Sequence, residues 1–138
     1  MKLKRDFLDA IFSDFVRMRD RWTCQRCATY YAPNKRRGLH NSHLVISRRG
    51  KSTRWLPENC AAMCRGCHGF FGENPEKARR WYIERYSREQ YDLVRFMARQ
   101  IMKSWELKDY KLAKAEFLKA EMARLEGLGY EPPARKKP

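Results

Sequence analysis

Apolar side chains recur at steps of three and four residues near the N-terminus of this chain. The positions are Phe7 (or Leu8), Ile11, Phe15, Met18 and Trp22. This spacing is typical of one face of an α-helix, so the pattern predicts an amphipathic helix over residues 4–22. Apolar neighbours broaden this face, and we expect it to pack against the segment that follows.

Two more helices are predicted after residue 73 from their start signals. Asn74 is a favourable N-cap and Pro75 suits the first helical position, which predicts that a helix begins there. Ser87-Arg-Glu-Gln90 is a capping-box pattern and predicts another helix that runs to Ile101.

The C-terminal region predicts a further helix and a tail. A helical pattern over residues 105–126 is followed by Gly127-Leu-Gly129, which is a natural stop for a helix. Residues 128–138 are a basic tail, and its last part, residues 132–138, has little to bury, so we expect that part to be frayed.

The central region predicts a knuckle, a strand and a short helix. Residues 23–38 contain a Cys-x-x-Cys pair with Pro and Gly nearby, which indicates a knuckle followed by a loop. Residues 39–47 include two adjacent β-branched side chains and are predicted to form a strand. Residues 48–51 are predicted to form a loop or the entry to a second strand, and residues 58–71 a short helix.

Four of the five cysteines come as two Cys-x-x-Cys pairs, Cys24 with Cys27 and Cys64 with Cys67. Each short turn presents two sulfurs to one ion, which suits tetrahedral zinc. Such an ion would staple together two segments that are distant in sequence. We therefore predict a structural Zn²⁺ site, with Cys60 as a small buried hydrophobic residue rather than a ligand.

Three other chemistries compete for these cysteines. A thioredoxin-like redox pair needs a flanking βαβ pattern, and this chain has two pairs rather than one. Cys64-Arg-Gly-Cys67-His68 also matches the attachment pattern of c-type haem, but haem attachment requires export and leaves Cys24 and Cys27 unexplained. His68 in place of Cys67 would give a Cys₃His zinc site, and the sequence leaves this choice open.

The chain is strongly basic, which points to a polyanionic partner. Its 138 residues contain 31 Lys and Arg against 16 Asp and Glu, a net charge of +15. Residues 17–54 carry eleven of these cations and one acid, Asp20. Neutralised phosphates release counterions, so this charge favours nucleic acid. A solvated face is the alternative, but the basic run overlaps the cysteines and histidines.

Neither export nor membrane insertion is indicated. Asp6, Asp9 and Asp14 interrupt the N-terminal region, which lacks the apolar run of a signal peptide. No stretch approaches the roughly 18 apolar residues of a membrane span. Cysteines in a chain without export favour metal thiolates over disulfides. We expect a cytoplasmic protein without a membrane partner.

All three histidines lie between residues 40 and 68, within or next to the loop between the cysteine pairs. The elements in order are Cys24-x₂-Cys27, Leu39-His40-Asn-Ser-His43, Asn59 and Cys64-x₂-Cys67-His68. In this order, over roughly residues 20–75, the chain resembles the HNH (ββα-metal) nucleases. The run Ser-His43-x-x-x-Ser-Arg-Arg and the ending Phe71-x-x-Asn-Pro75 look most like phage and prophage members.

The resemblance implies a role for each of these residues. Hydrolysis of a phosphodiester needs a base to activate water and a cation to stabilise the phosphorane. His43 matches the general base, Asn59 the residue that fixes the hairpin, and His68 a ligand of the catalytic ion. Arg48 and Arg54 are placed to grip the phosphate.

One position departs from the family pattern. Many members have Asp or His immediately before the base as a metal ligand, whereas here that residue is Ser42, a weak ligand. His40 lies two residues earlier, hence on the same side of a strand, and would assist His68 at the ion. The candidate catalytic cations are Mn²⁺, Ni²⁺, Mg²⁺ and Zn²⁺.

These patterns and the resemblance together predict one α+β domain over residues 1–138. Its parts are an N-terminal helix (1–22), a zinc-stapled ββα-metal core (23–75), a helical extension (76–127) and a basic tail (128–138).

The expected function is divalent-metal-dependent cleavage of DNA, which nicks or cuts duplexes and leaves 5′-phosphate and 3′-hydroxyl ends. The expected partner is double-stranded DNA, linear or branched. The alternative is a zinc-finger nucleic-acid-binding module without catalysis, which has no need of His43 and His68. No residue of the sequence excludes RNA as the substrate. The sequence does not define the oligomeric state of the protein.

Overall fold

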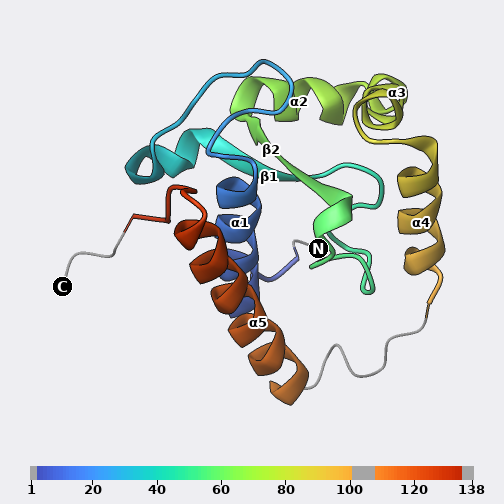
Figure 1. The fold of residues 1–138 in the computed structure, drawn as a ribbon. Helices are drawn as coiled ribbons and strands as arrows, with labels where there is room; N and C mark the ends of the chain where they lie inside the picture. The colour runs from blue at the N-terminus through green and yellow to red at the C-terminus, as the bar shows by residue number, and fades with distance from the viewer. Residues whose placement is uncertain (1–2, 101–107, 135–138) are drawn as a thin grey trace.

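Helices surround a small β-hairpin in this protein (Figure 1). The computed structural model describes residues 3–100 and 108–134. The elements are α1 (Phe7–Arg19), the 3₁₀ turn η1 (Pro33–Gly38), β1 (Leu39–His43), the 3₁₀ turn η2 (Pro57–Asn59), β2 (Cys60–Cys64), α2 (Arg65–Glu73), α3 (Pro75–Arg85), α4 (Arg88–Ala98) and α5 (Lys108–Gly127). The predicted mixture of α and β structure is confirmed. None of the described helices is long and apolar enough to cross a membrane.

β1 and β2 form an antiparallel pair, with Leu39 opposite Cys64 and His43 opposite Cys60. The predicted strand over residues 39–47 is therefore too long, and the helix predicted over residues 58–71 is wrong in its first half, which is β2. Residues 60–63 are a continuous buried apolar run, and periodicity alone does not separate a buried strand from a helix in such a run.

Asn59 explains why β1 ends at His43. Its side-chain oxygen accepts hydrogen bonds from the backbone N–H groups of Val45 (3.0 Å) and Ile46 (2.9 Å). Its amide group donates to the backbone oxygens of Ile46 and Thr53. These contacts occupy backbone groups that a longer strand would pair with β2, so the chain turns away.

α1 starts later and ends earlier than the predicted range of residues 4–22. Asp6 caps its start, because the Asp6 carboxylate accepts a backbone N–H of the first turn and the Asp9 side chain accepts the Asp6 N–H at 2.7 Å. At the other end Arg21 and Trp22 have φ angles of 57° and 56°, which no α-helix contains. Trp22 is buried all the same, so the apolar pattern predicted its burial but not its conformation.

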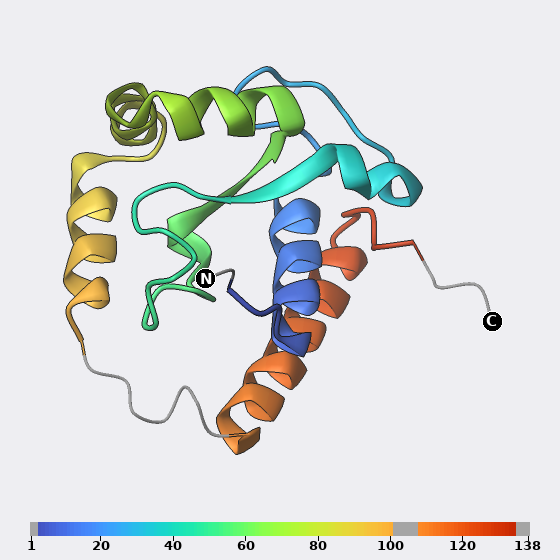
Figure 2. The same cartoon turned by 180° about the vertical axis from the view of Figure 1, so that it is seen from behind.

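α1 packs against the hairpin and against α5, which lies alongside it in both views (Figures 1 and 2). The core between them contains Leu8, Phe12, Val16 and Met18 of α1, Leu39 of β1, Ala62 and Met63 of β2, and Leu118 and Leu125 of α5. The apolar stripe of α1 therefore buries its side chains against the segment that follows, as expected, and also against a helix about a hundred residues further along the chain.

The predicted starts of α3 and α4 are confirmed. α3 begins at Pro75. α4 begins at Arg88, directly after Ser87, whose hydroxyl accepts the backbone N–H of Gln90 at 3.0 Å. α4 ends at Ala98, with Arg99 as its C-cap, so the helix predicted to run to Ile101 is too long. Ile101 itself lies outside the described residues.

α5 ends at Gly127, as the sequence predicted. The chain then returns to the end of α1, where the indole N–H of Trp22 donates to the backbone oxygen of Glu131 at 2.8 Å. The basic tail is therefore anchored to α1 at Glu131, just before the segment that we expect to fray. The predicted start of this helix near residue 105 and the tail residues 135–138 lie outside the described residues.

Asp9 ties α1 to the loop between the strands. Its carboxylate accepts hydrogen bonds from Arg54 (Nε, 3.0 Å) and from the indole of Trp55 (2.9 Å), and it lies 3.3 Å from Arg48. Asp9 and Arg54 are 8% and 7% exposed. Burial alone would raise the pKa of Asp9, but the hydrogen bonds from Arg54, the Asp6 backbone and Trp55 outweigh it and lower the pKa to about 2.

Asp9→Asn should destabilise the fold in a pH-dependent way. Because the folded-state pKa is depressed, ionised Asp9 stabilises the fold above a pH of about 4, and this stabilisation of about 2–3 kcal/mol is lost as the pH falls toward 2. Urea unfolding over this range should therefore show a gap between wild type and variant that shrinks with acid. Asp92→Asn, which removes the exposed partner of Arg88, should change stability by less than about 1 kcal/mol. Equal effects of the two substitutions would contradict this assignment.

Candidate metal centres and catalytic cleft

The four predicted zinc ligands converge from three segments. Cys24 and Cys27 lie on the turn after α1, Cys64 ends β2, and Cys67 lies in the first turn of α2. Their sulfurs all lie within 4.8 Å of one another, and the Sγ atoms of Cys27 and Cys64 are 3.8 Å apart. Sulfurs at the corners of a zinc tetrahedron with Zn–S bonds of about 2.3 Å are about 3.8 Å apart. The prediction of a four-cysteine site suited to structural zinc is confirmed.

Several hydrogen-bond donors point at the cysteine sulfurs and would stabilise their thiolate form. The backbone N–H of Cys27 points at Cys24 Sγ (3.5 Å), and that of Cys67 at Cys64 Sγ (3.4 Å). The Arg26 guanidinium lies 3.5 Å from Cys67 Sγ. A hydrogen bond with the Thr29 hydroxyl is the largest influence on Cys27 and lowers its pKa to about 6. The site therefore supplies positive partners for the charge that four thiolates bring to a metal.

Two alternative ligands lie outside the cysteine cluster. Cys60 is 2% exposed, and burial raises the pKa of its thiol. His68 directs its Nδ1 atom at Nδ1 of His40, 2.9 Å away, rather than at the sulfurs. The geometry therefore favours a Cys₄ site over a Cys₃His site.

The pair of His40 and His68 has the spacing of two ligands on one ion. Two nitrogens at neighbouring corners of an octahedron, each about 2.1 Å from the ion, are about 3.0 Å apart. Burial, followed by the charge of Arg17, lowers the pKa of His40, and burial lowers that of His68. Both rings are therefore biased to the neutral form that binds metals. A hydrogen bond with the Arg37 backbone orients the His40 ring.

His43 is held by the loop between the strands. Its Nε2 atom lies 2.8 Å from the backbone oxygen of Arg54. A carbonyl oxygen only accepts, so Nε2 carries the hydrogen and Nδ1 keeps a free lone pair. Burial is the main influence on the ring and lowers the pKa of His43, which favours a neutral imidazole able to take a proton.

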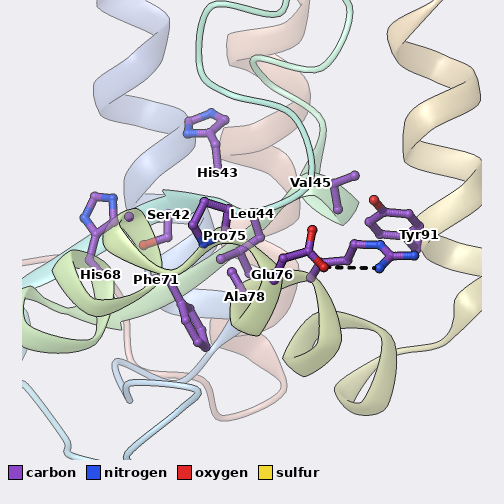
Figure 3. Close-up of a pocket in the computed structure, with 12 residues that line it drawn as sticks. Ser42, His43, Leu44, Val45, His68, Phe71, Pro75, Glu76, Ala78 and Tyr91 are labelled. Atoms are coloured by element: carbon purple, nitrogen blue, oxygen red, sulfur yellow. Dashed lines mark ion pairs between the residues drawn. The ribbon is translucent and has the colours of Figure 1, made fainter.

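Two cavities meet at His43 and His68, which line both of them. The α3-side cavity, of about 330 Å³, is also lined by Ser42, Phe71, Arg79 and Tyr91 (Figure 3). The α1-side cavity, of about 350 Å³, is also lined by Arg5, Arg17, His40 and Arg48. The second cavity is thus a cationic cleft, suited to a phosphate backbone.

The remaining predicted residues have different positions. Asn59 is fully buried and holds the loop, whereas Arg48 is partly exposed in the α1-side cavity. Arg54 is buried against Asp9 and lines neither cavity, so its guanidinium serves the fold. Ser42 is buried in the wall of the α3-side cavity.

Sequence reasoning missed three residues of this region. Asp9 engages Arg54 across 45 positions, and no local pattern indicates so distant a partner. Arg5 and Arg17 line the cleft from α1 and the segment before it. Arg17 belonged to the basic run of the sequence, but the packing of α1 on the hairpin was needed to place it beside the histidines.

Comparisons with protein-family models, with curated proteins and with solved structures find no match for this chain. The cysteine cluster and the three imidazoles at one cleft are therefore what a functional interpretation has to explain. The first is a four-cysteine cluster positioned to bind a metal ion, and the second is a group of histidines that line a cavity together with three arginines.

Cys64→Ser should release the metal and unfold the protein, because the binding free energy of a structural zinc is largely folding free energy. Cys60→Ala, which removes a buried thiol outside the cluster, should keep one zinc per chain. Metal analysis combined with circular dichroism distinguishes the two variants. Zinc that is lost from the Cys60 variant and kept by the Cys64 variant would overturn the ligand assignment.

Proposed function

We propose that this protein is a divalent-metal-dependent endonuclease of the HNH type, which hydrolyses phosphodiester bonds in DNA. One observation carries the proposal: Nδ1 of His40 and Nδ1 of His68 lie 2.9 Å apart, beside a cleft that His43 also lines. A protein that only binds nucleic acid has no need of a close pair of imidazoles with a third histidine lining the same cavity.

The order of elements supports the HNH interpretation. β1, β2 and α2 follow one another, and His43 is the last residue of β1. His68 comes directly after Cys67, so the cysteine cluster fixes the part of α2 that carries this imidazole. A hairpin followed by a helix, with one histidine on each, is the arrangement that the resemblance implies.

His40 and His68 are the residues that would hold the catalytic cation. When bound, it would stabilise negative charge on the phosphorane and on the leaving 3′ oxygen. Imidazole ligands favour Mn²⁺, Ni²⁺ or Zn²⁺ over Mg²⁺, which prefers oxygen.

His43 is the proposed general base. Its Nδ1 lone pair would take a proton from the attacking water, while Nε2–H stays bonded to the Arg54 oxygen. The water oxygen bonds to phosphorus, the bond to the 3′ oxygen breaks, and the 3′ oxygen takes a proton from solvent, which leaves a 5′-phosphate and a 3′-hydroxyl. Because burial lowers the pKa of His43, the ring stays neutral and competent into mildly acidic solution.

The α1-side cavity is the proposed path of the DNA backbone. Arg5, Arg17 and Arg48 line it beside the histidines. Arg48 lies 3.3 Å from Asp9 with its side chain 40% exposed, so its guanidinium remains accessible to a phosphate. Arg54 is not assigned to the phosphate, because Asp9 engages it in the interior.

A zinc-stapled nucleic-acid-binding module is the second candidate. The net charge of +15 and the cysteine cluster support it as well as they support a nuclease. A DNA cleavage assay with added divalent cations distinguishes the nuclease from the binding module. The module would bind DNA with a steep salt dependence and leave it intact.

His43→Ala should remove nearly all nicking of plasmid DNA, with a loss of about 10²- to 10⁴-fold in rate. Zinc content and affinity for duplex DNA should stay close to wild type, because the charge of the cleft is unchanged. Plasmid assays with Mn²⁺, Ni²⁺, Mg²⁺ and Zn²⁺ in turn, with chelator as the blank, provide the measurement. Wild-type nicking by this variant would favour the binding module or place the base elsewhere.

His40→Ala should raise the Mn²⁺ concentration needed for half-maximal activity without abolishing turnover, since one of two imidazole ligands is lost. Asn41→Ala is the matched control, because Asn41 is the next residue of β1 and lines the same cavity. It should titrate with Mn²⁺ as wild type does. A His40 variant that behaves like this control would exclude His40 as a ligand.

A further inference from the structure

The α3-side cavity has features that hydrolysis of a phosphodiester does not use. Ser42 in its wall is 1% exposed, and its hydroxyl oxygen has no hydrogen-bond partner within the part of the chain that the structure describes. Leaving a buried hydroxyl unpaired costs about 1–3 kcal/mol. The oxygen itself has almost no accessible surface, so a ligand can supply the partner only if it displaces part of the cavity wall.

α2 is rich in glycine, and one of its glycines, Gly72, lines this cavity. Gly66, Gly69 and Gly72 fall within nine helical residues, and each is exposed. A Cβ atom added to any of them would meet nothing within 4 Å, so packing within the described residues does not require glycine. Each glycine disfavours the helix by about 0.5–1 kcal/mol. Gly72 lines the cavity, where a missing side chain lets a ligand approach the helix closely.

The rest of the lining combines apolar side chains with a hydrogen-bond donor, Arg79, and a hydrogen-bond acceptor, Glu76. Val45, Phe71 and Tyr91 supply apolar surface (Figure 3). Glu76 and Arg79 form an ion pair of 3.6 Å, and the Arg79 guanidinium lies 5.7 Å from the centre of the Tyr91 ring. A nucleobase is complementary to this lining, because it has two apolar faces and an edge of hydrogen-bond donors and acceptors.

The volume and position of the cavity restrict the ligand further. About 330 Å³ is at the lower end of the range of roughly 300–1,000 Å³ for ligand sites, which suits one small group. His43 and His68 line the cavity and also the cleft proposed for the scissile phosphate. The nearest part of the substrate is therefore a nucleotide next to that phosphate.

From these observations, and resting on the proposed function, we infer that the α3-side cavity binds one unpaired nucleobase of the strand that is cut. A base inside a duplex has its faces stacked and its edge paired, so only a base outside the stack presents both to a protein. Contacts with Ser42, Glu76 and Arg79 would read its edge, and the apolar side chains would cover its faces.

Binding is measured without added divalent cation, so that no cleavage occurs. The two probes are one duplex with a single bulged adenosine and the same duplex with an abasic residue at the bulge, which differ only in the base. Wild type should bind the adenosine bulge about 5- to 150-fold more tightly, the range for one stacked base. Equal affinities for the two probes would overturn the inference.

Gly72→Leu fills the cavity and should abolish the preference for the adenosine bulge. Gly69→Leu is the matched control, because it makes the same change on α2 at a position with equally open surroundings that does not line the cavity. It should keep the preference. A preference that survives Gly72→Leu would place the base elsewhere and overturn the inference.

A second pair of variants does not depend on the helix. Arg79→Ala should reduce the preference for the adenosine bulge, whereas Arg80→Ala, an exposed neighbour that does not line the cavity, should only weaken binding of both probes equally. Equal behaviour of the two arginine variants would count against the site. Cleavage is assayed separately: a nuclease without a bulge preference would refute this site alone, and a bulge preference without cleavage would refute the proposed activity alone.

Discussion

A single buried carboxylate, Asp9, connects the scaffold to the candidate site. It accepts hydrogen bonds from Arg54 and Trp55 and thereby fixes the loop between the strands against α1. The backbone oxygen of Arg54 in turn bonds His43 Nε2 at 2.8 Å, which selects the tautomer with a free Nδ1. Asn59 holds the same loop from the other side through four hydrogen bonds. The tautomer and orientation of the His43 imidazole thus depend on the carboxylate of Asp9, which lines the α1-side cavity, and on the buried amide of Asn59.

The cysteine cluster supplies the second constraint, because it joins the turn after α1 to the start of α2. Cys67 and His68 are adjacent, so any metal held by the four sulfurs also sets the position of the His68 backbone. The scaffold and the candidate site therefore share one helix turn. A zinc in the cluster would act on the cleft by restricting where α2 begins, without contact with the substrate.

The sequence was informative where the signal is local. The Cys-x-x-Cys pairs predicted the four-sulfur cluster, the cap residues Asn74 and Ser87 predicted two helix starts, and Gly127 predicted the end of α5. It failed where tertiary partners decide. The apolar run of residues 60–63 is compatible with a buried strand and with a buried helix, and only its pairing with β1 decides between them. The basic run suggested Arg54 as a phosphate ligand, but a carboxylate 45 positions away engages it in the interior. The expectation that His40 lies beside His68 came from the resemblance, and the packing of α2 on β1 brings their Nδ1 atoms within 2.9 Å of each other.

The pairing of α1 with α5 has a consequence for the order in which the chain folds. α1 is synthesised about a hundred residues before α5 (Lys108–Gly127), yet α5 covers much of the apolar face of α1. During translation this apolar face stays exposed to solvent while the hairpin, α2, α3 and α4 are synthesised. Contacts of such long sequence separation slow folding, and exposed apolar surface promotes aggregation. The native core can therefore close only after α5 has left the ribosome, when the earliest and latest helices of the fold meet.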